Sequence, residues 1–250
     1  RASGDSVYTV AGAQLFTSGR VLAAEQRLVD AAGRRGGMVA HPTAIDLALL
    51  ESEANRVRLN PGQVLLVREM ASSGARVQLA IAPAGSGKTT AMDALSRAWT
   101  ASSGNVIGLA PSAAAAAQLG AQMQGHHDTL AKLVWDLTPG HSDLTTWKQR
   151  IGPKTLVVID EAGMADTVSL DTAVNFILAR GGSVRLIGDD QQLAAIGAGG
   201  VLRDIQAQHG ALRLTELLRF SDPAEGSASL ALREGHTAAL GFYLDSHRIH

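Results

Sequence analysis

A glycine-rich run that ends in a lysine and two threonines is the stretch of this sequence best suited to chemistry. It follows the largely apolar residues 77–81, in which Gln78 is the one polar residue, and precedes a helix-like segment that begins at Ala91. Glycines let such a loop turn its backbone N–H groups inward, and the next helix adds the positive end of its dipole. The loop therefore predicts binding of a nucleoside triphosphate. The residues expected to bind it are Pro83, Ala84, Gly85, Ser86, Gly87, Lys88, Thr89 and Thr90.

Two residues of this loop have distinct expected roles. Lys88 is expected to act in catalysis by reaching the β- and γ-phosphates, and the Thr89 hydroxyl is expected to ligate Mg²⁺. The full pattern opens with glycine, whereas this chain has Ala82 at that position. The core from Gly85 to Thr89 is complete, and it carries the phosphate contacts. The alternative is a glycine-rich turn that binds nothing.

Two adjacent carboxylates follow another apolar run. Residues 156–159 are all apolar, and Asp160 and Glu161 come next. At the end of a strand that faces the loop, Asp160 would hold Mg²⁺, directly or through its waters. Glu161 would accept a proton from the attacking water. The alternative is a strand followed by an acidic turn.

Three further polar sites could complete this chemistry. A third apolar run ends at Gly188 and leads to two glutamines, and a glutamine near the γ-phosphate can orient water. Arg219 could offset transition-state charge, although a single arginine is more often a surface residue. Gln63, just after Asn60 and Pro61, carries an amide that matches the N6/N7 edge of adenine. The alternative for Gln63 is a solvated residue at a helix start.

Apolar runs alternate with helix-like segments, and these elements must position the polar residues. The expected strands are 76–82, 105–110, 155–160, 183–188 and 211–214, and the expected helices between them are 87–101, 112–123 and 166–180. Strands that are apolar nearly throughout are typical of a parallel sheet covered on both faces. The pattern predicts an α/β fold in which ligands bind beyond the carboxyl ends of the strands.

Residues 1–58 are expected to form a small N-terminal helical accessory region. One helix should be capped by Ser18 or Thr17 and end near Gly33. A second should start near Thr43, where Asp46 three residues later resembles a capping box.

Residues 124–150 are polar and are interpreted as an inserted loop with a short helix over 130–137. His126 and His127 are then loop residues rather than metal ligands, since no helical spacing or carboxylate pair accompanies them. Residues 221–250 are expected to form a helical tail.

Composition excludes several classes of protein. The chain has 250 residues, of which 46% are hydrophobic and 18% charged, as in an ordinary globular protein. It contains no cysteine, which rules out disulfides and thiolate metal sites and fits a cytoplasmic location. The net charge of −1 gives no sign of a protein that coats DNA. No apolar run is long enough to predict a membrane segment.

Taken together, these positions resemble the first RecA-like domain of a superfamily 1 DNA helicase of the RecD-like branch. Within that branch they look most like the helicase part of a conjugative relaxase of the TraA/TrwC (MobF) type. The matching positions, in family order, are Gln63 for adenine, Ala84–Thr90 for the Walker A loop, Leu109–Ser112 for motif Ia, Asp160 and Glu161 for the Walker B pair, Gly188, Asp189, Gln192 and Leu193 for the Gly-Asp-x-x-Gln-Leu motif, and Arg219 for motif IV. On this resemblance, Gln192 and Arg219 are expected to act in catalysis beside the γ-phosphate.

The resemblance implies an ATP-driven motor that moves along single-stranded DNA, with ATP and Mg²⁺ as cofactors. It implies a RecA-like P-loop NTPase core over residues 59–220, in which Pro111, Ser112 and the segment near Thr129 border the DNA. Conjugative transfer proteins are expected partners of the full-length parent. A second RecA-like domain is not part of these 250 residues, so we expect the fragment to bind ATP, hydrolyse it poorly and not unwind DNA.

Other interpretations stay open at this point. A RecD-like DNA repair helicase would share the same motifs. A non-motor module that binds nucleotide or DNA would keep the fold without turnover, and a small-molecule kinase would keep the loop alone. Trp135 and Trp147 could stack on bases or pack within the protein.

Overall fold

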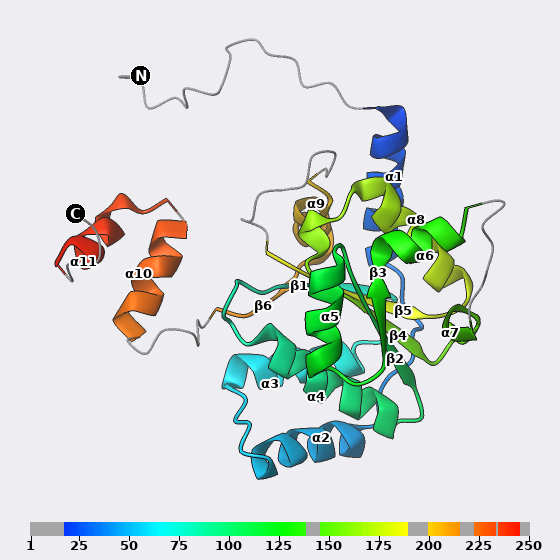
Figure 1. The fold of residues 1–250 in the computed structure, drawn as a ribbon, viewed down its shortest axis with the longest axis horizontal. Helices are drawn as coiled ribbons and strands as arrows, with labels where there is room; N and C mark the ends of the chain where they lie inside the picture. Colours follow the sequence, from blue (N-terminus) through cyan, green and yellow to red (C-terminus); the bar gives the residue numbers. More distant parts are fainter. Residues whose placement is uncertain (1–17, 139–145, 190–199, 216–222, 234, 246–250) are drawn as a thin grey trace.

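A computed structural model of the chain describes residues 18–138, 146–189, 200–215, 223–233 and 235–245. Within these residues, six strands form one sheet in the order β3-β2-β4-β5-β1-β6 (Figure 1). Every strand pairing is parallel. The strands are β1 (Val77–Ile81), β2 (Asn105–Ala110), β3 (His126–Thr129), β4 (Thr155–Ile159), β5 (Ser183–Gly188) and β6 (Leu212–Arg213). The expected α/β class with a parallel sheet is confirmed.

Helices cover both faces of the sheet, as crossover connections between parallel strands require. The α-helices are α1 (Gly19–Ala32), α2 (Pro42–Ala54), α3 (Pro61–Ser72), α4 (Lys88–Ala101), α5 (Ala113–Gln122), α6 (Leu130–Asp136), α7 (Thr146–Gln149), α8 (Thr167–Ala179), α9 (Val201–His209), α10 (Pro223–Arg233) and α11 (Leu240–Asp245). Two short 3₁₀ helices are η1 (Ala162–Met164) and η2 (Thr237–Ala239). Buried residues of α1, α6, α8 and α9 share one core with the sheet, and those of α2, α3, α4 and α5 share the other.

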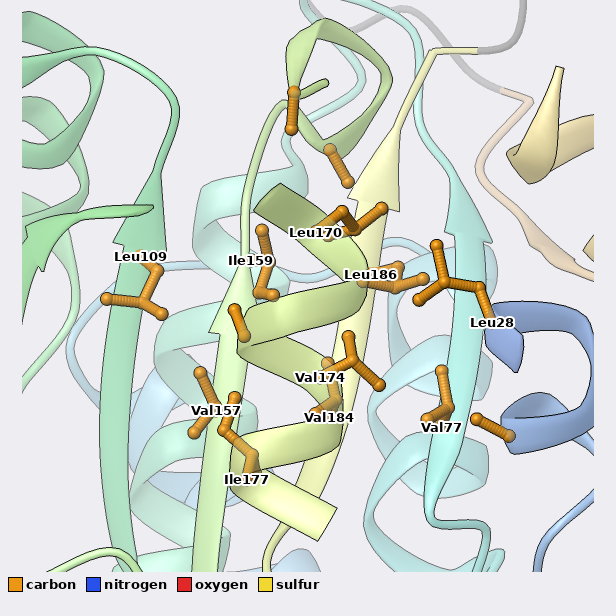
Figure 2. Packing of buried hydrophobic residues seen from close by; sticks show 14 of the residues in the cluster. Leu28, Val77, Leu109, Val157, Ile159, Leu170, Val174, Ile177, Val184 and Leu186 are labelled. Atoms are coloured by element: carbon orange, nitrogen blue, oxygen red, sulfur yellow. The ribbon is translucent and has the colours of Figure 1, made fainter. Parts of the chain in front are cut away.

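Alternate residues of the four central strands, β1, β2, β4 and β5, supply the two cores. In β4, Val157 and Ile159 belong to the core under α8, whereas Leu156 and Val158 belong to the core under α4. Figure 2 shows the first of these cores, where Leu170, Val174 and Ile177 of α8 lie over the apolar side chains of β4 and β5. The continuous apolar character of the strands therefore reflects burial on both sides.

The strand β3 corrects the interpretation of residues 124–150 as a loop. It pairs with β2 in parallel, with Ile107 opposite His126 and Ala110 opposite Thr129. Because β3 is an edge strand of four polar or half-buried residues, it has neither the length nor the apolar pattern that identifies a strand in sequence. The short helix after it was expected, and the Thr129 hydroxyl caps it by accepting a hydrogen bond from the Lys132 amide.

The capping box expected at Thr43 is also wrong. The helix α2 begins at Pro42, after His41, and no side chain caps it. Asp46 instead forms an ion pair with Arg68 of α3 at 2.6 Å. Proline at the first helical position supplies the start signal, because its fixed φ suits a helix and its missing N–H is not needed there.

Both N-terminal helices pack on the sheet domain. Ser18 caps α1 as expected, by accepting a hydrogen bond from the Val21 amide at 3.2 Å. Leu28 of α1 is fully buried in the core beneath α8, and Ile45 of α2 is buried against α4. The boundary expected near residue 58 stays a prediction, and α1 contributes to one core of the sheet domain while α2 contributes to the other. In the tail, α10, η2 and α11 contact one another.

Among the described residues, no helix combines the length and the apolar character needed to cross a bilayer.

Candidate nucleotide-binding site

The glycine-rich loop lies between the carboxyl end of β1 and the start of α4. Gly85 and Gly87 have φ angles of 83° and 72°, in the left-handed region that favours glycine, and Lys88 is the first residue of α4. The loop thus has the strand, turn and helix N-terminus that phosphate binding uses. Ala82, which replaces the first glycine of the pattern, is buried in the core and donates its backbone N–H to the Gly188 carbonyl at 2.8 Å.

A buried hydroxyl in this loop indicates a site built for a polar ligand. The Ser86 side chain is fully buried, and its Oγ has no hydrogen-bond partner among the described residues. Buried polar groups normally form hydrogen bonds, so an unpaired buried hydroxyl indicates that a bound ligand supplies its partner. Phosphate oxygens fit a loop that offers inward N–H groups, a hydroxyl and a lysine.

The two expected carboxylates lie at the carboxyl end of β4, and the structure brings Lys88 to both. Lys88 Nζ is 3.0 Å from Asp160 Oδ1, and it also donates a hydrogen bond to Glu161 Oε1. Burial acts to lower the pKa of Lys88, but the adjacent carboxylates outweigh it and hold the pKa above its ordinary value. Lys88 is therefore charged when it lies between the two acids.

The backbone at this acidic pair is unusual. Glu161 has φ 51° and ψ 37°, a left-handed conformation that non-glycine residues rarely adopt. Its backbone N–H donates to the Asp160 carboxylate at 2.9 Å, and the Asp160 N–H donates to the Leu109 carbonyl at 2.9 Å. Such conformations are found at functional sites, where the surrounding structure holds them in place.

One strand separates the loop from the acidic pair. β5 lies between β1 and β4, so Gly188 pairs with Ile81 at the end of β1, and Leu186 pairs with Ile159 at the end of β4. A side chain at Gly188 would meet Leu202 at 2.9 Å and the Gly163 backbone N at 3.3 Å. The glycine therefore lets the end of β5 pass close to the turn after the acidic pair. The glutamine and arginine expected to act here, Gln192 and Arg219, lie outside the described residues.

Gln63 faces the loop, and its amide is engaged there. It is fully buried at the start of α3, where it and Asn60 form a reciprocal capping box. Its Nε2 donates to the carbonyls of Gly87 at 3.0 Å and Ser86 at 3.3 Å. Sequence reasoning missed these contacts. The Asn-Pro-Gly-Gln spacing could have predicted the capping box, but not the carbonyl partners more than twenty positions away.

The segments expected to border DNA lie at the same edge of the sheet. Ala110 and Thr129 are register partners at the ends of β2 and β3, so Ser112, two residues after β2, and Thr129 lie at the carboxyl ends of neighbouring strands. Ser112 caps α5 by accepting a hydrogen bond from the Ala115 N–H at 3.2 Å. The two tryptophans differ, since Trp135 on α6 is 59% exposed, whereas Trp147 is 8% exposed and stacks on His126.

The sheet, the glycine loop and the acidic pair together define a P-loop-type α/β domain. The chain belongs to the AAA domain family, which matches residues 58–250. This membership confirms the expected resemblance to RecD-like helicases.

Conjugal transfer proteins are similar in sequence. TraA of Rhizobium radiobacter is 31% identical over 219 residues, which cover 86% of this chain and 18% of that protein. TraA of Agrobacterium fabrum is 30% identical over 208 residues, which cover 82% of this chain and 18% of that protein. The chain thus spans less than a fifth of the length of these relatives.

A helicase structure shares the fold. The crystal structure of Pif1 helicase from Candida albicans matches with a TM-score of 0.52 and 17% sequence identity. The match covers 70% of this chain and 44% of the helicase chain. At this identity the likeness shows the fold, and it agrees with the P-loop NTPase class expected from sequence.

Proposed function

We propose that this chain is the ATP-binding and ATP-hydrolysing motor domain of a helicase that translocates along single-stranded DNA, within a conjugative relaxase-helicase. One observation carries the proposal. Lys88, at the end of the glycine loop and the start of α4, contacts both Asp160 and Glu161. The similarity to conjugal transfer proteins supports the choice of parent.

Within this proposal each residue of the site has a defined task. The backbone of residues 83–90 and the Ser86 hydroxyl hold the phosphates, while Lys88 leaves the acidic pair to bind the β- and γ-phosphates. Thr89 and Asp160 hold Mg²⁺, which when bound neutralises phosphate charge. Glu161 orients the attacking water and accepts its proton. The catalytic roles of Gln192 and Arg219 remain predictions, and so does the part that Gln63 takes in binding the nucleotide.

Single-stranded DNA is the proposed track of the motor. The Pro111–Ser112 turn and Thr129 adjoin at one edge of the sheet, and this arrangement supports a shared DNA contact. The proposed partners of the full-length parent are conjugative transfer proteins, and the proposed compartment is the cytoplasm, where such a motor meets DNA.

The proposal is tested by measuring ATP binding and turnover, with and without single-stranded DNA. Three proteins are compared, namely the unsubstituted chain and the variants Lys88→Ala and Glu161→Gln. We expect slow turnover in the chain, lost nucleotide binding in Lys88→Ala, and retained binding without turnover in Glu161→Gln. Tight ATP binding with no turnover would support a non-motor module instead, and no nucleotide binding would overturn the proposal. A relaxase tyrosine motif encoded before Arg1 would distinguish the conjugative parent from a RecD-like repair helicase.

A further inference from the structure

The amide of Gln63 is engaged inside the protein at both ends. Its Nε2 donates to the Gly87 carbonyl at 3.0 Å and to the Ser86 carbonyl at 3.3 Å. Its Oε1 accepts the Asn60 N–H at 2.9 Å, and no part of the side chain is exposed. Only one orientation of the amide fits these partners, because the flipped form would set an oxygen against two carbonyls.

These contacts fix the point where the loop becomes a helix. Gly87 is in the left-handed region, with φ 72° and ψ 27°, and directly precedes Lys88. Its carbonyl also accepts the Ala91 N–H at 3.3 Å, which is the first hydrogen bond of α4. Gln63 therefore links the start of α3 to the start of α4. The link is the Gly87 carbonyl, which directly precedes Lys88, the first residue of α4.

We propose that Gln63 is a positioning residue that shapes the phosphate-binding loop, so that it contributes to binding of any triphosphate whatever its base. The inference rests on the proposed function of the loop. A base contact by the same amide would need Gln63 to give up two hydrogen bonds from a fully buried position. The contact with the Ser86 carbonyl is buried, and leaving a buried carbonyl unpaired is unfavourable, so the loop contacts are the more stable use of this amide.

Ligands that differ only in the base test the proposal. We would measure the affinities of Mg²⁺-ATP, Mg²⁺-GTP and Mg²⁺-tripolyphosphate for the chain and for Gln63→Met, which keeps the size of the side chain and removes its polar groups. We expect all three ligands to weaken by the same factor of about ten. Gln78→Met is the matched control, because Gln78 of β1 bonds to Ser73 and not to the loop. It should bind all three ligands as the chain does.

A loss confined to ATP would show a base contact and overturn the proposal, as would unchanged affinity for all three ligands. Gln63→Glu adds a readout that general loss of stability would not give. The neutral acid can donate one hydrogen bond to Gly87, whereas the carboxylate cannot, and burial favours the neutral form. As the pH falls from about 8 to about 6, the affinity of Gln63→Glu for tripolyphosphate should rise relative to that of Gln63→Met at the same pH. A constant ratio would contradict the proposal.

Hydrogen exchange in the ligand-free chain separates this inference from the proposed function. If the chain bound no triphosphate, the proposed function would fail, but the loop contact could still be measured. We expect faster exchange at the Gly87 and Lys88 amides in Gln63→Met and Gln63→Glu than in the chain or in Gln78→Met. Equal exchange rates would overturn the positioning role.

Discussion

Lys88 lies between the two carboxylates that follow β4, with its Nζ 3.0 Å from Asp160 Oδ1 and in a hydrogen bond with Glu161 Oε1. All three side chains are mostly buried, with 16% of Lys88, 14% of Asp160 and 23% of Glu161 exposed. The ammonium group thus supplies the positive charge that the acidic pair needs when no cation is bound. Binding of a magnesium nucleotide would replace one positive charge by another and release the lysine to the phosphates.

Substitution of Lys88 by alanine should therefore weaken ATP binding strongly. Charge-assisted hydrogen bonds to a ligand contribute about 1.5–3 kcal/mol each, so a loss of at least about tenfold in affinity is expected. Calorimetric titration with Mg²⁺-ATP measures it. Lys154→Ala is the control, because this exposed lysine is remote in sequence from the loop and should bind ATP normally. Equal affinities in the two variants would contradict the assignment of Lys88.

Glu161→Gln should separate binding from hydrolysis. The amide keeps the shape of the side chain and cannot accept the proton, and a general base contributes about 10²–10⁴-fold to a rate. We expect ATP affinity near that of the chain with turnover lower by at least about a hundredfold. Asp160→Asn is the informative comparison, since loss of the carboxylate proposed to hold Mg²⁺ should instead raise the magnesium concentration that ATP binding requires. Normal turnover in Glu161→Gln would exclude Glu161 as the base.

Sequence patterns anticipated this site because its key residues follow long apolar strands. The strand before the loop is apolar except for Gln78, the strand before Asp160 is apolar after Thr155, and parallel strands place their carboxyl ends at one edge. The pairing of Gln63 with the loop carbonyls could not be predicted, because it depends on how α3 packs against α4. The strand at His126 was missed for a different reason, since four residues give no period to detect.

The missed strand depends on a glycine that no other residue can replace without strain. Gly125 has φ 121°, and a Cβ there would lie 2.5 Å from the Val106 carbonyl oxygen. Gly125→Ala should therefore lower the free energy of unfolding by more than about 2 kcal/mol. Urea unfolding measures this loss. Gly19→Ala is the control, because its Cβ would meet nothing within 4 Å, and it should leave stability equal or slightly higher.

The two histidines of β3 predict a loss of stability in mild acid. Burial lowers the pKa of His126, which Asp128 only partly offsets, and burial with the charge of His126 lowers the pKa of His127. Both groups therefore bind protons more readily in the unfolded chain. The unfolded state gains protons as the pH falls below the ordinary value of 6.5, so the free energy of unfolding should decrease there.

Urea unfolding across this pH range, in the chain and in His127→Phe, measures the decrease. The variant should show a shallower dependence, because it removes one of the two groups. Leu50→Ala, which removes no titratable group from an exposed position on α2, is the control and should keep the slope of the chain. A slope in His127→Phe as steep as that of the chain would show that other groups cause the effect.

Exposure distinguishes the two tryptophans as base-stacking candidates. Trp135 is 59% exposed on α6, which begins beside Thr129, whereas Trp147 is buried against His126. Stacking on a base contributes about 1–3 kcal/mol, so Trp135→Ala should weaken single-stranded DNA binding about tenfold or more. Trp147→Ala should lower the melting temperature instead. Anisotropy with a labelled oligonucleotide measures the first effect, and Leu47→Ala, another exposed apolar residue, is its control. Because Leu47 lies on α2 and not beside Thr129, equal losses in Leu47→Ala and Trp135→Ala would place the DNA elsewhere on the domain.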